Sequence, residues 1–232
     1  MALKARIENG IVYSPYPSES SPEISLYQAM KQSLEQHGNR TALVWNDETI
    51  TFTQLLRMLQ CYAAGFQGYG VSKGDKVLVH LDNSLENVIA MLSIIFAGGV
   101  AVMSYPMLSN DDIYYRIKHS KSTHILTAGN EATRFNDMRS QVDIKGFFTV
   151  GNAPGFVSVT EFQSINENSY QESPVEDAKN ELAALIYTSG TTGHPKAVEF
   201  THFSIVSSLP LSSPYSTIWA MNLENRSEAS NC

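Results

Sequence analysis

From residue 24 to residue 209 the sequence alternates amphipathic runs with short runs rich in apolar and β-branched residues. In the first amphipathic run, apolar residues recur every three or four positions from Ile24 to Leu34, as they do on one face of a helix. The run Lys76–His80 is short and mostly apolar, as a buried strand would be. Repeated alternation of this kind is typical of an α/β fold, in which helices flank a doubly wound, mostly parallel sheet.

Spacing and stop signals predict the individual elements. Helices are expected over Ile24–His37, Thr53–Phe66, Ser84–Ala97, 109–119 and Glu131–Arg139, and another begins near His202. Strands are expected over Thr41–Trp45, Thr49–Phe52, Lys76–His80, Val100–Met103, Thr123–Thr127, Gly146–Val150, Leu182–Tyr187 and Lys196–Thr201. Two helices open on sequences that resemble capping boxes, Asn83-x-x-Glu86 and Ser109-x-x-Asp112.

Changes in composition divide the chain into three parts. Residues 24–209 form the α/β domain, and residues 1–23 precede it as an N-terminal arm. Within the domain, residues 151–180 are polar, rich in Pro, Gly and Ser, and lack a clear period, so we expect a long surface connection there. Residues 210–232 also lack a period and form an atypical tail.

Composition argues against several classes of function. The formal net charge is -7, whereas nucleic-acid binding usually shows a basic face. The two cysteines give no disulfide framework and the histidines show no metal-ligand spacing, so we expect a reducing compartment and no metal site. The longest apolar run, Val88–Met103, is shorter than the roughly 20 residues that span a bilayer. We therefore expect no transmembrane segment and an intracellular location, cytoplasmic or peroxisomal, although the chain lacks a C-terminal peroxisomal tripeptide.

The strongest chemical signal is the loop that directly follows the buried strand Leu182–Tyr187. Its glycines, Gly190 and Gly193, permit positive φ and close backbone approach, so several N–H groups can converge on one anion. Hydroxyl groups and one cation complete the set. They belong to Thr188, Ser189, Thr191, Thr192 and Lys196. This combination predicts a phosphate-binding loop.

The loop differs from a P-loop, because Gly193 is followed by His194-Pro195-Lys196 and no helix is indicated there. Pro195 suits the beginning of a strand, where its missing N–H costs nothing. The expected geometry is strand, loop, strand. A hairpin turn without a ligand would also accept a Thr/Gly-rich sequence, but the spaced glycines, hydroxyls and lysine together favour an anion site.

The segment Tyr187–His202 resembles the signature of the adenylate-forming superfamily, which includes acyl-CoA synthetases, 4-coumarate–CoA ligases, insect luciferases and nonribosomal adenylation domains. The similarity extends backward through Lys73–Val77 and Ala97–Val100 and covers roughly residues 24–209. Val12–Pro17 is similar to the opening segment of the 4-coumarate-ligase and luciferase-like branch, which we favour. The resemblance implies that residues 24–209 are part of an AMP-binding N-terminal domain.

The resemblance also implies a reaction. The loop would hold the pyrophosphate portion of ATP while a carboxylate attacks the α-phosphorus, giving an acyl-adenylate and pyrophosphate. In acyl-CoA synthetases the thiol of CoA then displaces AMP, and Mg²⁺ screens the phosphates throughout. The implied phosphate ligands are Thr188, Ser189, Gly190, Thr191, Thr192, Gly193 and Lys196. Positioning and electrostatic stabilisation would dominate such catalysis.

Two departures from the family pattern bear on this reading. Ala197 stands where the family usually has Gly, which would strain a position with positive φ but is mild in an ordinary strand. The chain ends at Cys232, whereas the family continues with an aromatic-rich motif, a ribose-binding Asp, a hinge and a C-terminal domain with the adenylation Lys. We therefore assign no catalytic or metal-binding residue and expect a fragment that is inactive alone.

Three functions remain open at this point. The chain is the N-terminal portion of an ATP-dependent acyl-activating ligase, or a non-catalytic short form that binds nucleotide and regulates the full-length enzyme, or a protein whose loop is purely structural. An open sheet edge and exposed apolar surface would favour aggregation, or association with a chaperone or with the full-length enzyme.

Overall fold

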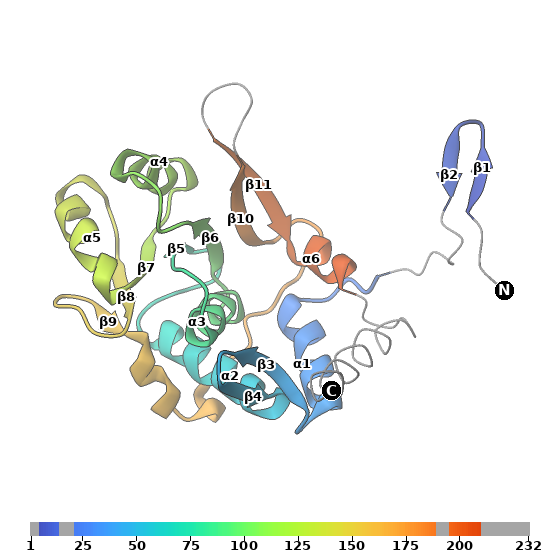
Figure 1. Cartoon of the computed structure of the whole chain (residues 1–232), viewed down its shortest axis with the longest axis horizontal. Coiled ribbons are helices and arrows are strands. Elements are labelled where there is room, and N and C mark those ends of the chain that lie inside the picture. The colour runs from blue at the N-terminus through green and yellow to red at the C-terminus, as the bar shows by residue number, and fades with distance from the viewer. Residues whose placement is uncertain (1–4, 14–20, 189–194, 210–232) are drawn as a thin grey trace, which may run out of the picture.

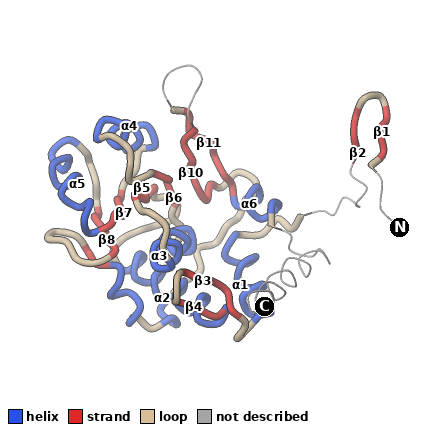
Figure 2. Tube along the Cα trace, in the orientation of Figure 1, coloured by secondary structure: helices blue, strands red, loops and turns tan. Residues whose placement is uncertain are grey.

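The computed structural model describes residues 5–13, 21–188 and 195–209. Its centre is a seven-stranded sheet in the order β11-β10-β6-β5-β7-β8-β9, in which neighbouring strands are parallel except for the antiparallel pair β10 and β11. The strands are β5 (Lys76–His80), β6 (Val100–Ser104), β7 (His124–Ala128), β8 (Gly146–Val150), β9 (Val157–Ser158), β10 (Leu182–Thr188) and β11 (Lys196–Thr201). The expected α/β class with a mostly parallel sheet is confirmed (Figures 1 and 2).

Helices lie on both faces of this sheet. One face is covered by α1 (Leu26–His37), α2 (Phe52–Gly68) and α3 (Leu85–Phe96), and the other by α4 (Asn110–Ser120) and α5 (Ala132–Met138). Successive strand residues point to opposite faces, so Val77 and Val79 join the core beneath α2 and α3 while Leu78 joins the core beneath α4 and α5. The last described helix, α6 (His202–Ser208), packs against α1.

Smaller elements complete the described structure. They are the hairpins β1 (Arg6–Glu8) with β2 (Ile11–Tyr13) and β3 (Thr41–Trp45) with β4 (Glu48–Thr51), and the 3₁₀ turns η1 (Gly129–Glu131), η2 (Arg139–Gln141), η3 (Val159–Ser164) and η4 (Glu167–Ser169). The hairpin β3–β4 was predicted from sequence, within one residue of the strand bounds observed.

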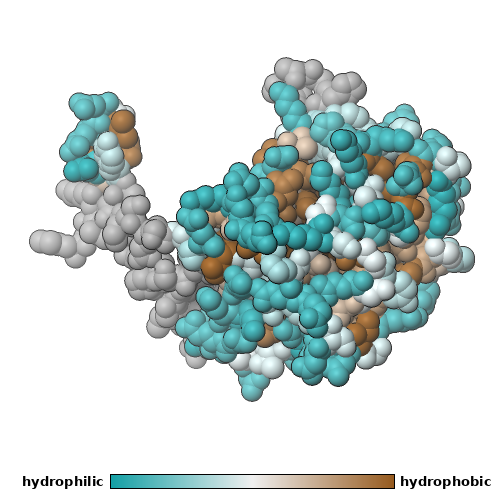
Figure 3. Space-filling view, turned by 180° about the vertical axis from the view of Figure 1, so that it is seen from behind, coloured by the Kyte–Doolittle hydropathy of each residue, from teal (hydrophilic) through white to brown (hydrophobic). Residues whose placement is uncertain are grey.

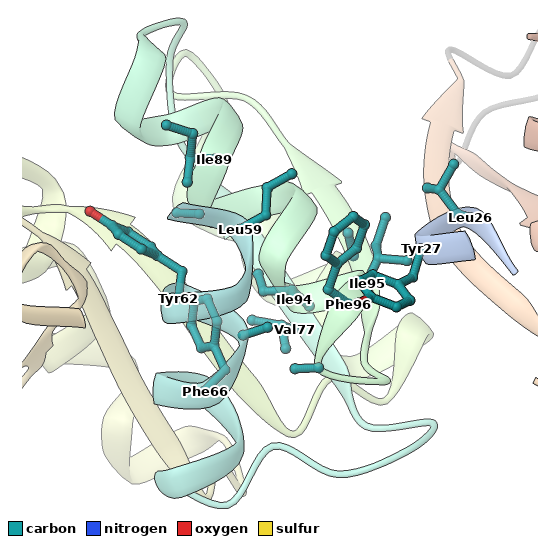
Figure 4. Packing of buried hydrophobic residues seen from close by; sticks show 14 of the residues in the cluster. Leu26, Tyr27, Leu59, Tyr62, Phe66, Val77, Ile89, Ile94, Ile95 and Phe96 are labelled. Atoms are coloured by element: carbon teal, nitrogen blue, oxygen red, sulfur yellow. The ribbon is translucent and has the colours of Figure 1, made fainter. Parts of the chain in front are cut away.

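Aromatic and branched side chains fill the larger core (Figure 4). Tyr62 and Phe66 from α2 and Ile94 from α3 are almost completely buried between these two helices and the sheet. Phe96 at the end of α3 meets Tyr27 of α1 edge to face, with ring centroids 4.9 Å apart. These contacts join the three helices of this face into one layer.

Two helix starts test the predicted capping boxes. Ser109 caps α4 as expected, because its hydroxyl accepts a hydrogen bond of 3.1 Å from the amide of Asp112. The prediction for α3 was wrong by one residue: Ser84, not Asn83, is the cap, and its hydroxyl accepts from the amide of Asn87 at 3.1 Å. Asn and Ser cap helices about equally well, so the sequence alone could not choose between adjacent candidates.

The segment 151–180, expected to be a surface connection, is exposed over most of its length but enters the core at η3. Val159 and Phe162 are buried there, and the ring of Phe162 packs edge to face on Phe66 at a centroid distance of 5.4 Å. The segment showed no period because it is built from short 3₁₀ turns and extended stretches. It therefore anchors α2 as well as connecting β8 to β10.

The β1–β2 hairpin stands apart from the sheet in Figures 1 and 3, and all six of its strand residues are exposed. Its exposed apolar side chains are Ile7, Ile11, Val12 and Tyr13. Elsewhere on the face seen in Figure 3, hydrophobic residues occur in patches among hydrophilic ones. Within the described ranges, no helix is both long enough and apolar enough to cross a bilayer.

Candidate phosphate-binding site

The ends of the predicted loop lie at the carboxyl edge of the sheet. Thr188 is the last residue of β10 and Lys196 is the first residue of β11, and the two are direct partners in the antiparallel ladder. The hydroxyl of Thr188 reaches to within 3.5 Å of the carbonyl oxygen of Lys196. The two predicted strands that flank the segment 189–194 are confirmed, and their pairing holds the lysine and one hydroxyl side by side.

The other predicted phosphate ligands fall on a segment that the structure does not describe. They are Ser189, Gly190, Thr191, Thr192 and Gly193. Their roles stay predictions, whereas Thr188 and Lys196 have defined positions at the two ends of that segment.

Burial on both sides fixes β10 in the sheet. Ala183 and Leu185 are buried in the cores on opposite faces, and Ala184 pairs with Ala101 of the parallel strand β6. Because β10 runs parallel to β6, its carboxyl end falls on the same edge as the carboxyl ends of the other parallel strands, where open α/β sheets bind ligands.

Lys196 presents an available positive charge. Its side chain is exposed, and among the described residues no carboxylate lies within ion-pair distance of its ammonium group. The next residue, Ala197, is an ordinary strand residue opposite Tyr187 and is not among the residues with positive φ. The replacement of the family's usual glycine by Ala197 is therefore mild.

Helix α4 supports both ends of the loop. The hydroxyl of Tyr115 donates a hydrogen bond of 3.2 Å to the carbonyl oxygen of Pro195. One turn further on, Nδ1 of His119 lies 2.9 Å from the hydroxyl oxygen of Tyr187 in β10. The same helix thus contacts the chain just before the loop leaves the sheet and just before it returns.

Tyr187 is buried in the core beneath α4. The guanidinium of Arg116 lies 4.6 Å from the centroid of its ring, a cation–π contact. Burial raises the pKa of the Tyr187 phenol, and the nearby Tyr115 acts in the same direction, so the phenol stays neutral and its hydroxyl remains a hydrogen-bonding group.

A row of buried polar residues crosses three strands at the same edge. His80 of β5 pairs in register with Ser104 of β6 on one side and with Thr127 of β7 on the other. Its Nδ1 lies 2.9 Å from the hydroxyl of Ser104, and Oε2 of Glu131 is 3.7 Å from its Nε2. Burial, reinforced by the charge of Arg134, lowers the pKa of His80 to about 4, so the imidazole is neutral near pH 7.

His202 follows β11 and has a structural role at the opposite edge. Its Nδ1 accepts a hydrogen bond of 3.2 Å from the amide of Leu26 at the start of α1, and burial lowers its pKa. It borders a cavity of about 380 Å³ that opens where β5, β6 and β10 begin, next to Lys76, Val100 and Leu182. That cavity lies at the amino edge of the sheet, away from the loop.

The described residues fit a phosphate group better than they fit a magnesium ion. Lys196 and Thr188 offer a cation and a hydroxyl to an anion. In the described parts of the chain, no group of three or more His, Cys, Asp or Glu residues could hold a metal.

Sequence reasoning missed the contribution of α4. Tyr115 and His119 are four residues apart, so they were bound to share one face of the predicted helix. The sequence gives no sign of which strand that face meets, because the pairing of β10 with β6 brings together segments far apart in the chain.

A sequence model of the family described as "AMP-binding enzyme" matches residues 30–226. This match includes most of the segment 210–232 that composition marked as an atypical tail. A 4-coumarate–CoA ligase of Vanilla planifolia is 26% identical over 215 residues, which cover 90% of this chain and 39% of that protein. A 2-succinylbenzoate–CoA ligase of Bacillus licheniformis is 32% identical over 185 residues, covering 77% of this chain and 35% of that protein.

Solved structures show the same fold. A long-chain-fatty-acid–CoA ligase from Archaeoglobus fulgidus superposes with a TM-score of 0.77 at 24% identity, covering 89% of this chain and 41% of that one. The luciferase-like enzyme of the mealworm Zophobas morio gives a TM-score of 0.71 at 20% identity, covering 80% and 44% of the two chains. The chain spans little more than a third of the length of the curated relatives it matches.

Proposed function

The chain belongs to the AMP-binding enzyme family, and from this we propose that its loop 188–196 holds the pyrophosphate portion of ATP during the activation of a carboxylic acid. The observation that carries the proposal is the position of Lys196, exposed and without a carboxylate partner among the described residues, directly opposite Thr188 at the carboxyl edge of the sheet. An unpaired cation beside a hydroxyl at this edge suits a phosphate group.

The reaction that we propose for the intact ligase has two steps. An oxygen of the substrate carboxylate attacks the α-phosphorus of ATP, the bond from that phosphorus to the β-phosphate oxygen breaks, and pyrophosphate leaves. The thiol of CoA then gives up its proton to solvent, and its sulfur attacks the acyl carbon. The bond from that carbon to the phosphate oxygen breaks, and AMP leaves with the electron pair. The relatives' names support this chemistry, since they describe ligases of 4-coumarate and 2-succinylbenzoate with CoA.

In this scheme the residues of the chain act on the leaving pyrophosphate. The ammonium of Lys196 offsets negative charge that builds up on the pyrophosphate as the α–β bond breaks, and the hydroxyl of Thr188 donates a hydrogen bond beside it. Magnesium would enter bound to the nucleotide and would supply further charge neutralisation. Because the chain spans only about a third of its relatives, we propose that these 232 residues bind the nucleotide without completing acyl transfer.

Binding of MgATP and of magnesium pyrophosphate to the purified chain, measured by isothermal titration calorimetry, tests the proposal. A charge-assisted hydrogen bond contributes about 1.5–3 kcal/mol, so Lys196→Ala is expected to weaken both ligands by at least about tenfold. Lys31→Ala, which removes a partly exposed cation that pairs with Glu35 on α1, is the control and should leave both affinities unchanged. Failure of the wild-type chain to bind either ligand, or full binding by Lys196→Ala, would refute the proposal.

Exchange of labelled pyrophosphate into ATP separates binding from chemistry. We expect no exchange by this chain with either 4-coumarate or a long-chain fatty acid as the probe carboxylate. Exchange above the level of the Lys196→Ala variant would show that these residues alone complete the first step.

A further inference from the structure

We propose that Tyr115 is a positioning residue for Lys196 and acts through the peptide bond between Pro195 and Lys196. This inference rests on the proposed phosphate-binding role of the loop and adds to it a residue from α4, outside the motif. The contact that carries it is the hydrogen bond of 3.2 Å from the Tyr115 hydroxyl to the Pro195 carbonyl oxygen.

The acceptor of this bond controls the direction of the lysine. The carbonyl of Pro195 and the amide of Lys196 belong to one planar peptide unit, so a donor that fixes the oxygen also fixes the plane from which the Lys196 side chain departs. Pro195 has no N–H, which leaves its carbonyl as the only backbone group through which it can be held. The ladder partner of Lys196, Thr188, orients the residue from the other side.

Tyr115 is itself held in place. Its ring stacks on that of His119, with centroids 5.3 Å apart and planes inclined by 23°. It also meets Tyr187 edge to face at 6.4 Å, and Nδ1 of His119 lies 2.9 Å from the Tyr187 hydroxyl oxygen. The three rings therefore form a rigid support between α4 and the end of β10.

The support from Tyr115 matters because the side chain of Lys196 is flexible. Lysine carries a point charge on four flexible methylene groups, and no carboxylate among the described residues draws the ammonium of Lys196 into a fixed direction. A fixed starting point for the side chain reduces the freedom that it loses when it binds an anion. The hydroxyl of Tyr115 supplies that fixed point, and its loss should act on phosphate binding more than on folding.

The experiment compares Tyr115→Phe with Tyr114→Phe. Tyr115→Phe removes the hydroxyl and keeps the ring that contacts His119 and Tyr187. Tyr114→Phe removes a hydroxyl from the preceding residue of the same helix and keeps the ring that lies 5.5 Å from the ammonium of Lys118. Three quantities are measured for each protein: amide hydrogen exchange over residues 196–198 without ligand, affinity for magnesium pyrophosphate and for AMP, and the melting temperature.

For Tyr115→Phe we expect amide exchange over residues 196–198 to become at least about fivefold faster and pyrophosphate to bind about five- to tenfold more weakly. AMP affinity should stay the same, because the loop is proposed to hold only the phosphates that leave, and the melting temperature should fall by no more than that of Tyr114→Phe. Tyr114→Phe should match the wild type in exchange and affinity.

The outcomes separate this inference from the function on which it rests. Unchanged amide exchange over residues 196–198 in folded Tyr115→Phe overturns the inference, whatever the ligand affinities are. Faster exchange with unchanged pyrophosphate affinity, in a wild type that binds pyrophosphate, also overturns it. A wild-type chain that binds no pyrophosphate refutes the proposed function instead, and in that case the exchange result alone decides whether Tyr115 holds the peptide.

Discussion

The backbone of α2 at Gly65 lies directly against the ring of Phe162, so that a Cβ atom on Gly65 would stand 2.3 Å from Cγ of that ring. Real Cβ atoms do not approach a neighbour so closely, and the ring is held by Phe66, Tyr62 and Phe148 around it. The glycine is required here for space, and it is what allows the segment 151–180 to reach the core.

Substitution of Gly65 by Ala should destabilise the fold through overpacking. We expect Gly65→Ala to lower the free energy of unfolding by about 2 kcal/mol. Gly68→Ala is the matched control on the same helix, because a Cβ at Gly68 would meet nothing within 4 Å and φ there is not positive. Urea denaturation followed by circular dichroism measures both, and equal midpoints for the two variants would contradict the steric argument.

The cap of α3 gives a second test. Ser84→Ala removes the hydroxyl that accepts from the amide of Asn87 and should lower the free energy of unfolding by about 1 kcal/mol. Asn83→Ala changes the adjacent exposed residue, which caps nothing, and should be close to neutral. A larger loss from Asn83→Ala than from Ser84→Ala in the same denaturation assay would restore the cap predicted from sequence.

Because of His80, the free energy of unfolding should depend on pH. Its pKa is about 4 in the fold and 6.5 without the fold's influence, so the unfolded chain binds a proton more readily and stability falls as the pH is lowered from 6.5 to 4. The loss attributable to His80 approaches about 3 kcal/mol at the lower limit. Unfolding free energies of wild type and His80→Gln at several pH values measure it, since the variant should show a shallower decline.

The matched control for His80 is His37→Gln, which removes a half-buried imidazole from the end of α1. Its slope of stability against pH shows what the change of a histidine to glutamine does at a second position, and the slope of His80→Gln is compared with it. If wild type and His80→Gln decline in parallel, the burial of His80 is not the cause of the decline.

Asp75 precedes β5 and contacts residues that precede β7 and β8. It accepts hydrogen bonds from the amide of Ser72 and the hydroxyl of Thr123, and its Oδ1 lies 3.3 Å from the ammonium of Lys145. Burial alone would raise the pKa of Asp75, but these donors outweigh burial, and the pKa is lower than its usual 3.8.

We expect Asp75→Asn to lower the free energy of unfolding by about 1–2 kcal/mol at pH 7, because the charge-assisted hydrogen bonds weaken. The lowered pKa means that the contribution is present above pH 3.8 and is lost as the pH falls through the pKa of the folded state, so the two proteins should converge in acid. Asp137→Asn, an exposed change on α5, is the control. A constant difference between Asp75→Asn and wild type down to pH 2 would contradict this account.

The spacing of apolar residues predicted most of the fold, because the residues of a helix or strand that face the core recur at the period of that element. The strands β5, β8 and β11 begin and end at the predicted residues, and α1 and α2 differ from prediction by two residues or fewer at each end. The segment 151–180 was less predictable, since its apolar residues, Phe162 among them, follow no period and only the fold gives Phe162 a partner at Gly65.

The sequence predicted the chemistry of the candidate site but not the contacts from α4 that hold it. Glycines, hydroxyls and Lys196 identify an anion loop without any structure, because their chemistry is local. The support from Tyr115 and His119 depends on which strand lies beneath α4, and that follows from the pairing of Ala184 with Ala101. The polar row around His80 is hidden for the same reason, since its three members come from three strands that meet only in the sheet.

The place of β10 in the strand order also determines when the site can form. During synthesis, β5, β6, β7 and β8 leave the ribosome first and can pair with one another before β10 exists. The pairing of residue 184 with residue 101 is a distant contact, which forms slowly because a long stretch of chain must be closed. A nascent chain halted before residue 182 would therefore carry a paired sheet with no loop, and the loop would be added in a late step of folding.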